Sequence, residues 1–562
     1  MTFTQNFTAV GDNLVLSALV AVIPILYFFW ALAIKRMKGY IAGLTTLLIT
    51  LVLAVAAFGM PAQMAVMSAT HGAVYGVIPI GWIIISSVFL YKLTVKTGQF
   101  DIIRNSVVAL TEDRRLQALL VAFSFGAFLE GAAGFGAPVA ISAALLVGLG
   151  FNPLYAAGLC LIANTAPVAF GAIGAPILAL EGPTGISALE ISKMVGRQLP
   201  FLSVVIPFYL IVIMGGFKKA MEVMPAILVT GISFAVTQFL SSNYLGPELP
   251  DILSALVSLL ALGIFLKFWK PKTIFRFSAE SEIAAALAEE EPESKPVYTG
   301  GQIFKAWSPF LVLTGVISIW GIPAVKLALT GHYEGTNPLL SAINSIGHAL
   351  SFVPNVPFLN NKVINAAGVP VPAFYKLELL GAAGTAVLIA AIISKFIVKI
   401  SWKNWVAAFG ETLNELKYPI ITIASVVAYA YVTNSSGMST SMGMTLAKTG
   451  FLFPFFSPIL GWLGVFITGS DTSSNLLFGN MQKVTATSIG MDPVLALAAN
   501  SSGGVTGKMI SPQSIAVACA AVGIAGKESD LLRFTIKHSI ILVILIGVMT
   551  FLQNGLLSWM IP

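Results

Sequence analysis

Long apolar runs separated by short charged loops dominate the chain. Runs such as residues 13–34, 40–59 and 540–560 approach the ~20 residues that a helix needs to cross a bilayer. Because Lys and Arg concentrate in cytoplasmic loops, the basic clusters give the direction of each run, and they indicate about 12 crossings with both termini outside. The pattern predicts an all-α, polytopic membrane protein.

The basic clusters also divide the loops into two classes. Clusters that begin at Lys35, Lys92, Lys218, Lys267, Lys395 and Lys527 are predicted to be cytoplasmic, whereas residues 241–250 and 331–361 contain few basic residues and are predicted to be external. Lys193 and Arg197 do not follow this rule. The loop that contains them is therefore not assigned to a side.

Composition supports a membrane protein and narrows its chemistry. Of the 562 residues 57% are hydrophobic and only 10% are charged, against ~25% charged residues in soluble domains. The net charge of +7 comes from the clusters between spans, so it indicates orientation and not a nucleic-acid partner. Cys160 and Cys519 lie in apolar segments without metal-ligand spacing. No metal site and no cofactor are predicted.

A polar, acidic segment at residues 271–302 separates two halves, residues 1–270 and 303–562. Its composition is typical of a solvated cytoplasmic linker, and a regulatory site is the alternative. Each half is predicted to contain a re-entrant hairpin and then a broken helix. These are residues 116–150 and 153–178 in the first half, and residues 450–490 and 493–524 in the second.

The broken helices share the spacing N-x6-G-x4-P. It is formed by Asn164, Gly171 and Pro176 in the first half and by Asn500, Gly507 and Pro512 in the second. The loop charges predict that the two hairpins enter from opposite faces of the membrane. This arrangement is the inverted-topology repeat of secondary transporters, whose substrate sites lie near the midplane.

Glu130 lies in the first hairpin, in the stretch FLEGAAGFGAPVA, without a basic residue nearby in the sequence. The glycines and Pro138 are poor helix formers and favour a helix–break–helix hairpin, although glycines also allow close helix packing. An acid at membrane depth is a functional candidate. Glu130 is therefore predicted to couple transport to protons.

The broken helices supply the candidate substrate-binding groups. Asn164 and Thr165 in the first, and Asn500 and Ser501 in the second, are predicted to lie at breaks where amides, hydroxyls and helix N-termini receive a small anion. The alternative is that these side chains satisfy backbone groups at ordinary kinks.

The second half contributes three further candidates. Asp471, in TGSDTSSN, is a second candidate proton carrier, or a helix cap, and Ser473 of the same cluster is a candidate substrate ligand. Lys508 is the cation of the second broken helix, and it is predicted to bind a substrate carboxylate or to pair with Glu130 or Asp471. The alternative for Lys508 is an interfacial position.

The stretches FLEGAAGFGAPVAI, ANTAPVAFGAIG, GSDTSSN and TGKMISPQSIA are similar to signature segments of the bacterial L-lactate permease family. The repeated hairpin and break also resemble, more loosely, the ion-transporter superfamily that includes divalent-anion symporters. The resemblance covers nearly the whole chain. It implies proton-coupled uptake of L-lactate, with D-lactate and glycolate as further substrates, at the bacterial plasma membrane.

Together these observations predict a carrier that takes up a small 2-hydroxy-monocarboxylate with a proton. Its predicted partners are lactate, protons and the lipid bilayer, with a homodimer as a further option and no nucleic acid. Coupling to sodium, or transport of another small carboxylate, stays open from the residues alone. The chain has no HExxH motif, no Ser/His pair on adjacent spans and no protease-type aspartate pair, so no enzyme is predicted.

Overall fold

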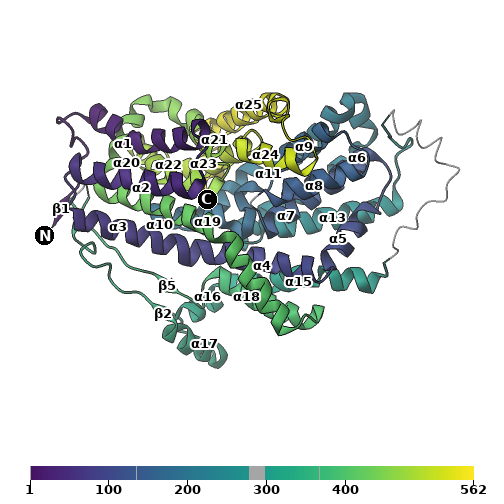
Figure 1. The fold of residues 1–562 in the computed structure, drawn as a ribbon, viewed down its shortest axis with the longest axis horizontal. Coiled ribbons are helices and arrows are strands. Elements are labelled where there is room, and N and C mark those ends of the chain that lie inside the picture. The colour runs from purple at the N-terminus through teal and green to yellow at the C-terminus, as the bar shows by residue number, and fades with distance from the viewer. Residues whose placement is uncertain (1, 135, 278–297, 366–367) are drawn as a thin grey trace.

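The computed structural model describes residues 2–134, 136–277, 298–365 and 368–562, and it is predominantly helical (Figure 1). In the described part, 11 helices are long and apolar enough to cross a membrane. There are up to 12 if the pair Pro153–Ala163 and Val168–Thr184, bent by 66°, forms one span. The predicted polytopic helical membrane fold is confirmed.

The first half contains a continuous series of helices. They are α1 (Leu14–Phe29), α2 (Gly39–Ala56), α3 (Ala62–Tyr75), α4 (Trp82–Lys96), α5 (Gln99–Val108), α6 (Arg114–Gln117), α7 (Gly126–Ala132), α8 (Ala137–Gly148), α9 (Pro153–Ala163), α10 (Gly171–Thr184), α11 (Ala188–Glu222), α12 (Met224–Tyr244) and α13 (Pro250–Phe268). π-Helical segments at Trp30–Ile34, Gly76–Gly81 and Ala118–Phe125 extend α1, join α3 to α4 and join α6 to α7. The short 3-10 helix Val168–Phe170 precedes α10.

The second half begins at α15, after a predicted linker of which residues 278–297 lie outside the described residues. Its helices are α15 (Gly300–Gly321), α16 (Pro323–Thr330), α17 (Pro338–Ala349), α18 (Ala383–Val398), α19 (Trp402–Ser436), α20 (Met438–Leu446), α21 (Phe453–Thr468), α22 (Asp471–Ser488), α23 (Pro493–Lys508), α24 (Pro512–Ala521) and α25 (Glu528–Gln553). Short 3-10 helices lie at Ala447–Leu452 and Ser558–Met560.

Within the described residues, five two-residue strands accompany the helices, and the sequence pattern did not predict them. β1 (Phe3–Thr4) pairs in parallel with β3 (Val363–Ile364), which pairs antiparallel with β4 (Pro370–Val371). β2 (Ser351–Phe352) pairs antiparallel with β5 (Leu377–Glu378). The strand β1 and the N-terminus lie at one end of the long axis of the bundle, and α5 and α6 lie at the other (Figure 1).

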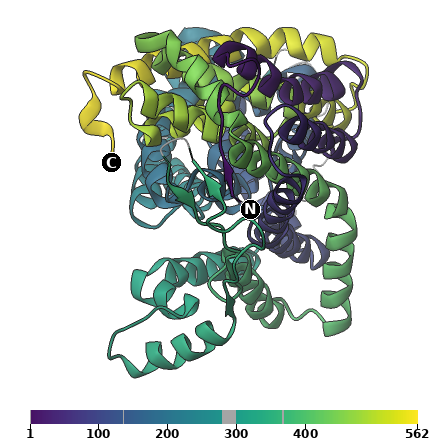
Figure 2. The ribbon, with the colours of Figure 1, turned by 90° about the vertical axis from the view of Figure 1, so that its left-hand side faces the viewer.

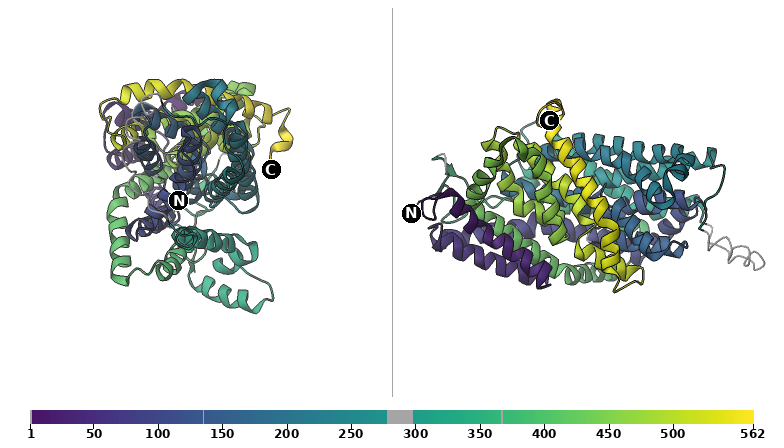
Figure 3. Two further views of the ribbon diagram at one scale, coloured as in Figure 1. Left: turned by 90° about the vertical axis from the view of Figure 1, so that its right-hand side faces the viewer. Right: turned by 90° about the horizontal axis from the view of Figure 1, so that it is seen from above.

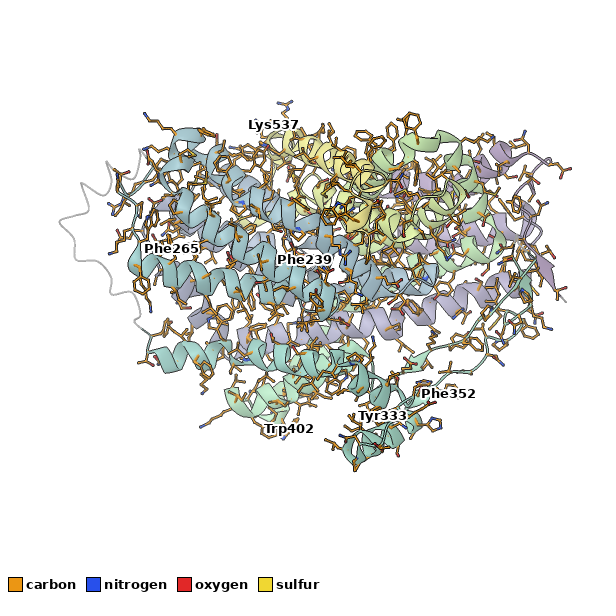
Figure 4. All side chains as sticks on the ribbon, turned by 180° about the vertical axis from the view of Figure 1, so that it is seen from behind. Phe239, Phe265, Tyr333, Phe352, Trp402 and Lys537 are labelled. Atoms are coloured by element: carbon orange, nitrogen blue, oxygen red, sulfur yellow. The ribbon has the colours of Figure 1, made fainter. Side chains whose placement is uncertain are left out.

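The helices form one main bundle with a projecting flank. α19 packs along α2, α3 and α4, and α11 packs against α12, which packs against α13. The segment with α16 and α17 projects from this bundle (Figure 2), and α25 crosses its neighbours obliquely (Figure 3). Apolar side chains such as Phe239 and Trp402 lie exposed on the outer surface (Figure 4), as a lipid-facing surface requires.

A buried ion-pair cluster holds the end of the bundle from which the first hairpin starts. Arg115 is fully buried, and its guanidinium donates to Asp113 Oδ2 and Glu222 Oε2, each at 2.7 Å. The same side chain donates to the carbonyl oxygen of Thr273, just after α13. These bonds fix the start of α6 against the end of α11 and against the first described residues of the linker.

Four interrupted elements meet inside the bundle. α7, which ends at Ala132, packs against α8, which begins at Ala137, and α21 packs against α22 across Gly469 and Ser470. α8 also packs on α24, α10 packs on α22, and α21 packs on α23. The turns of these helix pairs and the breaks after α9 and α23 are therefore brought to one region.

Candidate substrate site

A buried ion pair joins the two halves at this region. Glu130, on the last turn of α7, is 3% exposed, and Lys508, the last residue of α23, is 7% exposed. The Nζ atom of Lys508 lies 2.7 Å from Oε1 of Glu130, across 378 residues of sequence. Lys508 is thus buried and not interfacial, and its partner is Glu130.

The ion pair borders a small cavity of about 80 Å³. This volume is several times the ~10–15 Å³ that one water molecule needs, so the cavity has room for a small organic acid. Asp471 also lines the cavity, and Val168, Ala172 and Val517 supply apolar wall. Among its lining residues Lys508 is the one cation, facing two carboxylates.

Asp471 is held by the second half alone. It begins α22, and its Oδ2 accepts hydrogen bonds from the Ser501 hydroxyl at 2.6 Å and from the Asn475 amide at 3.4 Å. Its Oδ1 is buried and has no hydrogen-bond partner among the described residues. Asp471 therefore has one unused acceptor, which packs beside the main chain of Gly504.

Glycine is required where the carboxylates approach the backbone. A Cβ atom at Gly171 would lie 2.6 Å from Oε1 of Glu130, and one at Gly504 would overlap Oδ1 of Asp471. Both contacts would be far closer than van der Waals contact. Each carboxylate therefore packs directly against the main chain of a broken-helix segment.

Each half is also interrupted near the glycine and proline of the shared spacing. In the first half Ala172, Ile173 and Gly174 have positive φ angles of 44°, 56° and 73°, a costly conformation for a β-branched residue. In the second half the helix ends at Lys508 and resumes at Pro512. Counting from the aligned asparagines, Lys508 corresponds to Ala172, and it is the last helical residue before the second break.

The structure distinguishes among the predicted substrate ligands of the first half. Asn164 ends α9 at the first break, as predicted, and it is 5% exposed. Both polar atoms of its amide, and the hydroxyl of Thr165, lack a hydrogen-bond partner among the described residues. Neither side chain lines the small cavity. They are buried polar side chains that lie outside the lining of the cavity.

The second-half ligands are arranged differently. The prediction that Asn500 lies at a break is wrong, because Asn500 lies inside α23, two turns before its end. Its amide donates to Asn475 Oδ1 at 2.9 Å and accepts from Gln482 Nε2 at 3.0 Å. Ser501 is engaged with Asp471, and Ser473 lines a second, larger cavity.

Asp251 is a site residue that the sequence analysis missed. It lies in the first turn of α13, 1% exposed, and its Cβ would be 2.7 Å from a Cβ at Gly131, the residue after Glu130. Neither carboxylate oxygen has a hydrogen-bond partner in the described part of the chain. The only signal in the sequence was an acid at the start of an apolar run. An acid at that position is also common at the N-terminus of an ordinary helix, so it did not indicate a site.

His71 is a packed residue. Its Nε2 lies 2.9 Å from the carbonyl oxygen of Phe374, and its ring contacts Tyr375 and Tyr431 edge-on. No group of three His, Cys, Asp or Glu residues able to hold a metal ion occurs among the described residues.

Comparison with known proteins gives a consistent result. Residues 17–557 match the family model described as L-lactate permease. The chain is 73% identical to the L-lactate permease of Bacillus subtilis (strain 168), with all of both chains covered. It is 54% identical to the glycolate permease GlcA of Escherichia coli (strain K12), again with all of both chains covered. It is 51% identical to the L-lactate permease of the same strain, with 99% of each chain covered.

Among solved structures, the YdaH transporter of Alcanivorax borkumensis matches at a TM-score of 0.49 and 11% sequence identity. The alignment covers 93% of this chain and 99% of that one.

Proposed function

Since the chain belongs to the L-lactate permease family, a family of transporters and not enzymes, we propose that it takes up L-lactate by proton symport. It is a multi-pass protein of the bacterial plasma membrane. D-lactate and glycolate are proposed as further substrates, and the similarity to a glycolate permease supports the latter. The observation that carries the proposal is the Lys508–Glu130 pair beside a cavity of suitable size.

In this proposal, substrate binding is coupled to proton uptake because Lys508 is the one cation that lines the cavity. When a substrate carboxylate enters the cavity, Lys508 faces both that anion and Glu130. A buried charge without compensation costs several kcal/mol. Glu130 therefore takes up a proton as the substrate binds, and the Lys508 ammonium moves its hydrogen bond from Glu130 to the substrate. The loaded site then differs from the empty site by one anion and one proton.

Selection of 2-hydroxy acids is assigned to Asp471. Asp471 lines the cavity and has an unpartnered Oδ1, so a small rotation of its side chain would let it accept a hydrogen bond from the 2-hydroxyl group while Lys508 holds the carboxylate. The apolar wall, including Val168 and Val517, accommodates the methyl group of lactate, which glycolate lacks. Both enantiomers of lactate keep the two polar contacts, because only the methyl and hydrogen positions exchange.

In this proposal the other polar side chains named above hold the site in place or contact the substrate as it moves. They are Asn164, Thr165, Asn500, Ser501 and Ser473. Asn500 and Ser501 fix Asn475 and Asp471 by hydrogen bonds. Asn164 and Thr165 have unused polar atoms that would bind substrate or freed backbone when the two halves move against each other. The movement of one bundle relative to the other carries the loaded site across the membrane.

The test is uptake of labelled lactate into proteoliposomes with the pH and sodium gradients imposed independently. We expect accumulation when the lumen is alkaline, with or without sodium. If accumulation follows the sodium gradient and does not depend on pH, sodium and not the proton is the coupling ion. Absence of saturable lactate transport in either condition would refute the proposed substrate.

A further inference from the structure

A second cavity adjoins the substrate site. Its volume is about 980 Å³, and it lies between α1, α2 and α19 on one side and α21, α24 and α25 on the other. Ser470, Thr472 and Gln513 line both this cavity and the small one. The two spaces are therefore separated only by the turn between α21 and α22 and by the first residues of α24.

Part of the lining of this larger cavity comes from a loop that the sequence predicts to be cytoplasmic. Arg36 and Lys38, between α1 and α2, line it, as does Glu528 at the start of α25. This loop carries the first basic cluster of the sequence, which the positive-inside rule places in the cytoplasm. Its exposed cations would raise the local concentration of small anions.

The opposite side of the site is bridged by hydrogen bonds to α10. Asn475 donates to the carbonyl oxygen of Pro176 at 3.0 Å, and Lys483 donates to that of Thr184 at 2.6 Å. Asn434 of α19 donates to the carbonyl oxygen of Pro183 at 2.9 Å. These bonds tie α10 to α22 and α19, so they must break before the site can open on that side.

The partition between the cavities has one movable part. Gly469 has φ of 71°, and a Cβ there would lie 2.6 Å from Oε1 of Gln513, so the Gln513 amide rests on the turn. The turn is braced, since the Thr468 hydroxyl donates to the Gly464 and Ser470 carbonyl oxygens. Rotation of the long Gln513 side chain is less costly than deformation of this turn.

We infer that the larger cavity is a water-filled cytoplasmic vestibule through which the substrate anion leaves, and that Gln513 over Gly469 is its inner gate. The inference rests on the proposed function for the identity of the anion. The proposed route does not depend on which anion is transported, because it is defined by the two cavities and by the residues that line both. Ser473, which lines only the larger cavity, is then a contact of the departing substrate.

Side-specific thiol labelling tests this inference. The two native cysteines are buried and can be replaced by alanine. Single cysteines are then placed in the vestibule (Ser473→Cys and Ser529→Cys) and in the small cavity (Val517→Cys). Ser345→Cys on α17 serves as the external control. A membrane-impermeant anionic thiol reagent is applied to right-side-out and to inside-out vesicles.

We expect both vestibule cysteines to react from the cytoplasmic side only, and the control cysteine from the outside only. The Val517→Cys thiol should react slowly, and adding Gln513→Ala should accelerate it from the cytoplasmic side. Reaction of the vestibule cysteines only with a lipid-soluble maleimide would mean that lipid fills the space, and the inference would be overturned. Equal reaction from both sides, or no effect of Gln513→Ala, would overturn the route or the gate.

Lactate uptake by the cysteine-free background is measured in parallel. Failure of uptake with the expected labelling would refute the proposed substrate and leave the vestibule standing. Normal uptake without the expected labelling would refute the vestibule alone.

Discussion

Replacing Lys508 by glutamine should lower both the stability of the protein and its affinity for lactate, and the two effects can be measured separately. The substitution removes the ammonium that lies 2.7 Å from Glu130, whose other oxygen already lacks a described partner. Removing one member of a buried pair typically costs ~3–5 kcal/mol, and protonation of Glu130 reduces this loss. A charge-assisted hydrogen bond to the substrate contributes ~1.5–3 kcal/mol, so the KM for lactate should rise roughly 10- to 150-fold.

A double variant separates the two effects. Lys508→Gln combined with Glu130→Gln removes both charges and leaves two amides of similar volume. Stability should largely recover because no unpaired charge stays buried. The KM should stay high, because the substrate still lacks a cation. Lys508→Arg should restore affinity only in part, since a planar guanidinium is larger and donates in other directions.

The assays are thermal unfolding of the purified protein in detergent and the concentration dependence of lactate counterflow. Lys92→Gln is a matched control, because this lysine also pairs with a glutamate, Glu415 at 2.6 Å, and lines neither cavity. The reasoning would be refuted by an unchanged KM in Lys508→Gln. Recovery of a normal KM in the double variant would equally show that Lys508 only balances Glu130.

Three further variants address the remaining groups. Glu130→Gln should abolish pH-driven accumulation and flatten the pH dependence of uptake, but it should keep lactate exchange, because glutamine mimics the protonated acid. Retained accumulation would mean that Glu130 has only a structural role. Asp471→Asn should lower the preference for lactate over propionate about fivefold. The Asn carbonyl oxygen would stay with the Ser501 and Asn475 donors, so an NH2 group, which cannot accept, would replace Oδ1. An unchanged preference would exclude the hydroxyl contact. Asp251→Asn should keep pH-driven accumulation, because an amide can replace a carboxyl group that is buried without partners and therefore neutral. Loss of accumulation in this variant would mean that Asp251 carries the coupling proton.

Much of the architecture follows from local sequence. Glycine and proline interrupt apolar runs at residues 131–138 and 171–176, and the helices do stop or bend there, because these residues lack helix propensity or a backbone donor. The pairing of Lys508 with an acid followed from the cost of burying a lone charge. That requirement left two candidates, and only the three-dimensional packing of α7 against the second half selects Glu130.

The remaining features depend on contacts between distant segments. Asn500 and the residues after it have the composition of a break, yet α23 continues through them. The Asn500 side chain is engaged by Asn475 and Gln482, so it does not compete for the backbone of its own helix. Asp251 reaches the site because Gly131 allows α13 to pack closely on α7. Neither contact leaves a periodic signal in the sequence.

The separation of Glu130 and Lys508 along the chain has a consequence for biogenesis. At ~5–20 residues per second of synthesis, the 378 residues between them take roughly 20 to 75 s to appear. During that interval the first hairpin must enter the bilayer without its cation, and hence with its acid protonated or shielded by the insertion machinery. A ribosome-bound fragment that ends before Lys508 should therefore stay protease-sensitive at α7, and resistance should be acquired only after the second half has inserted.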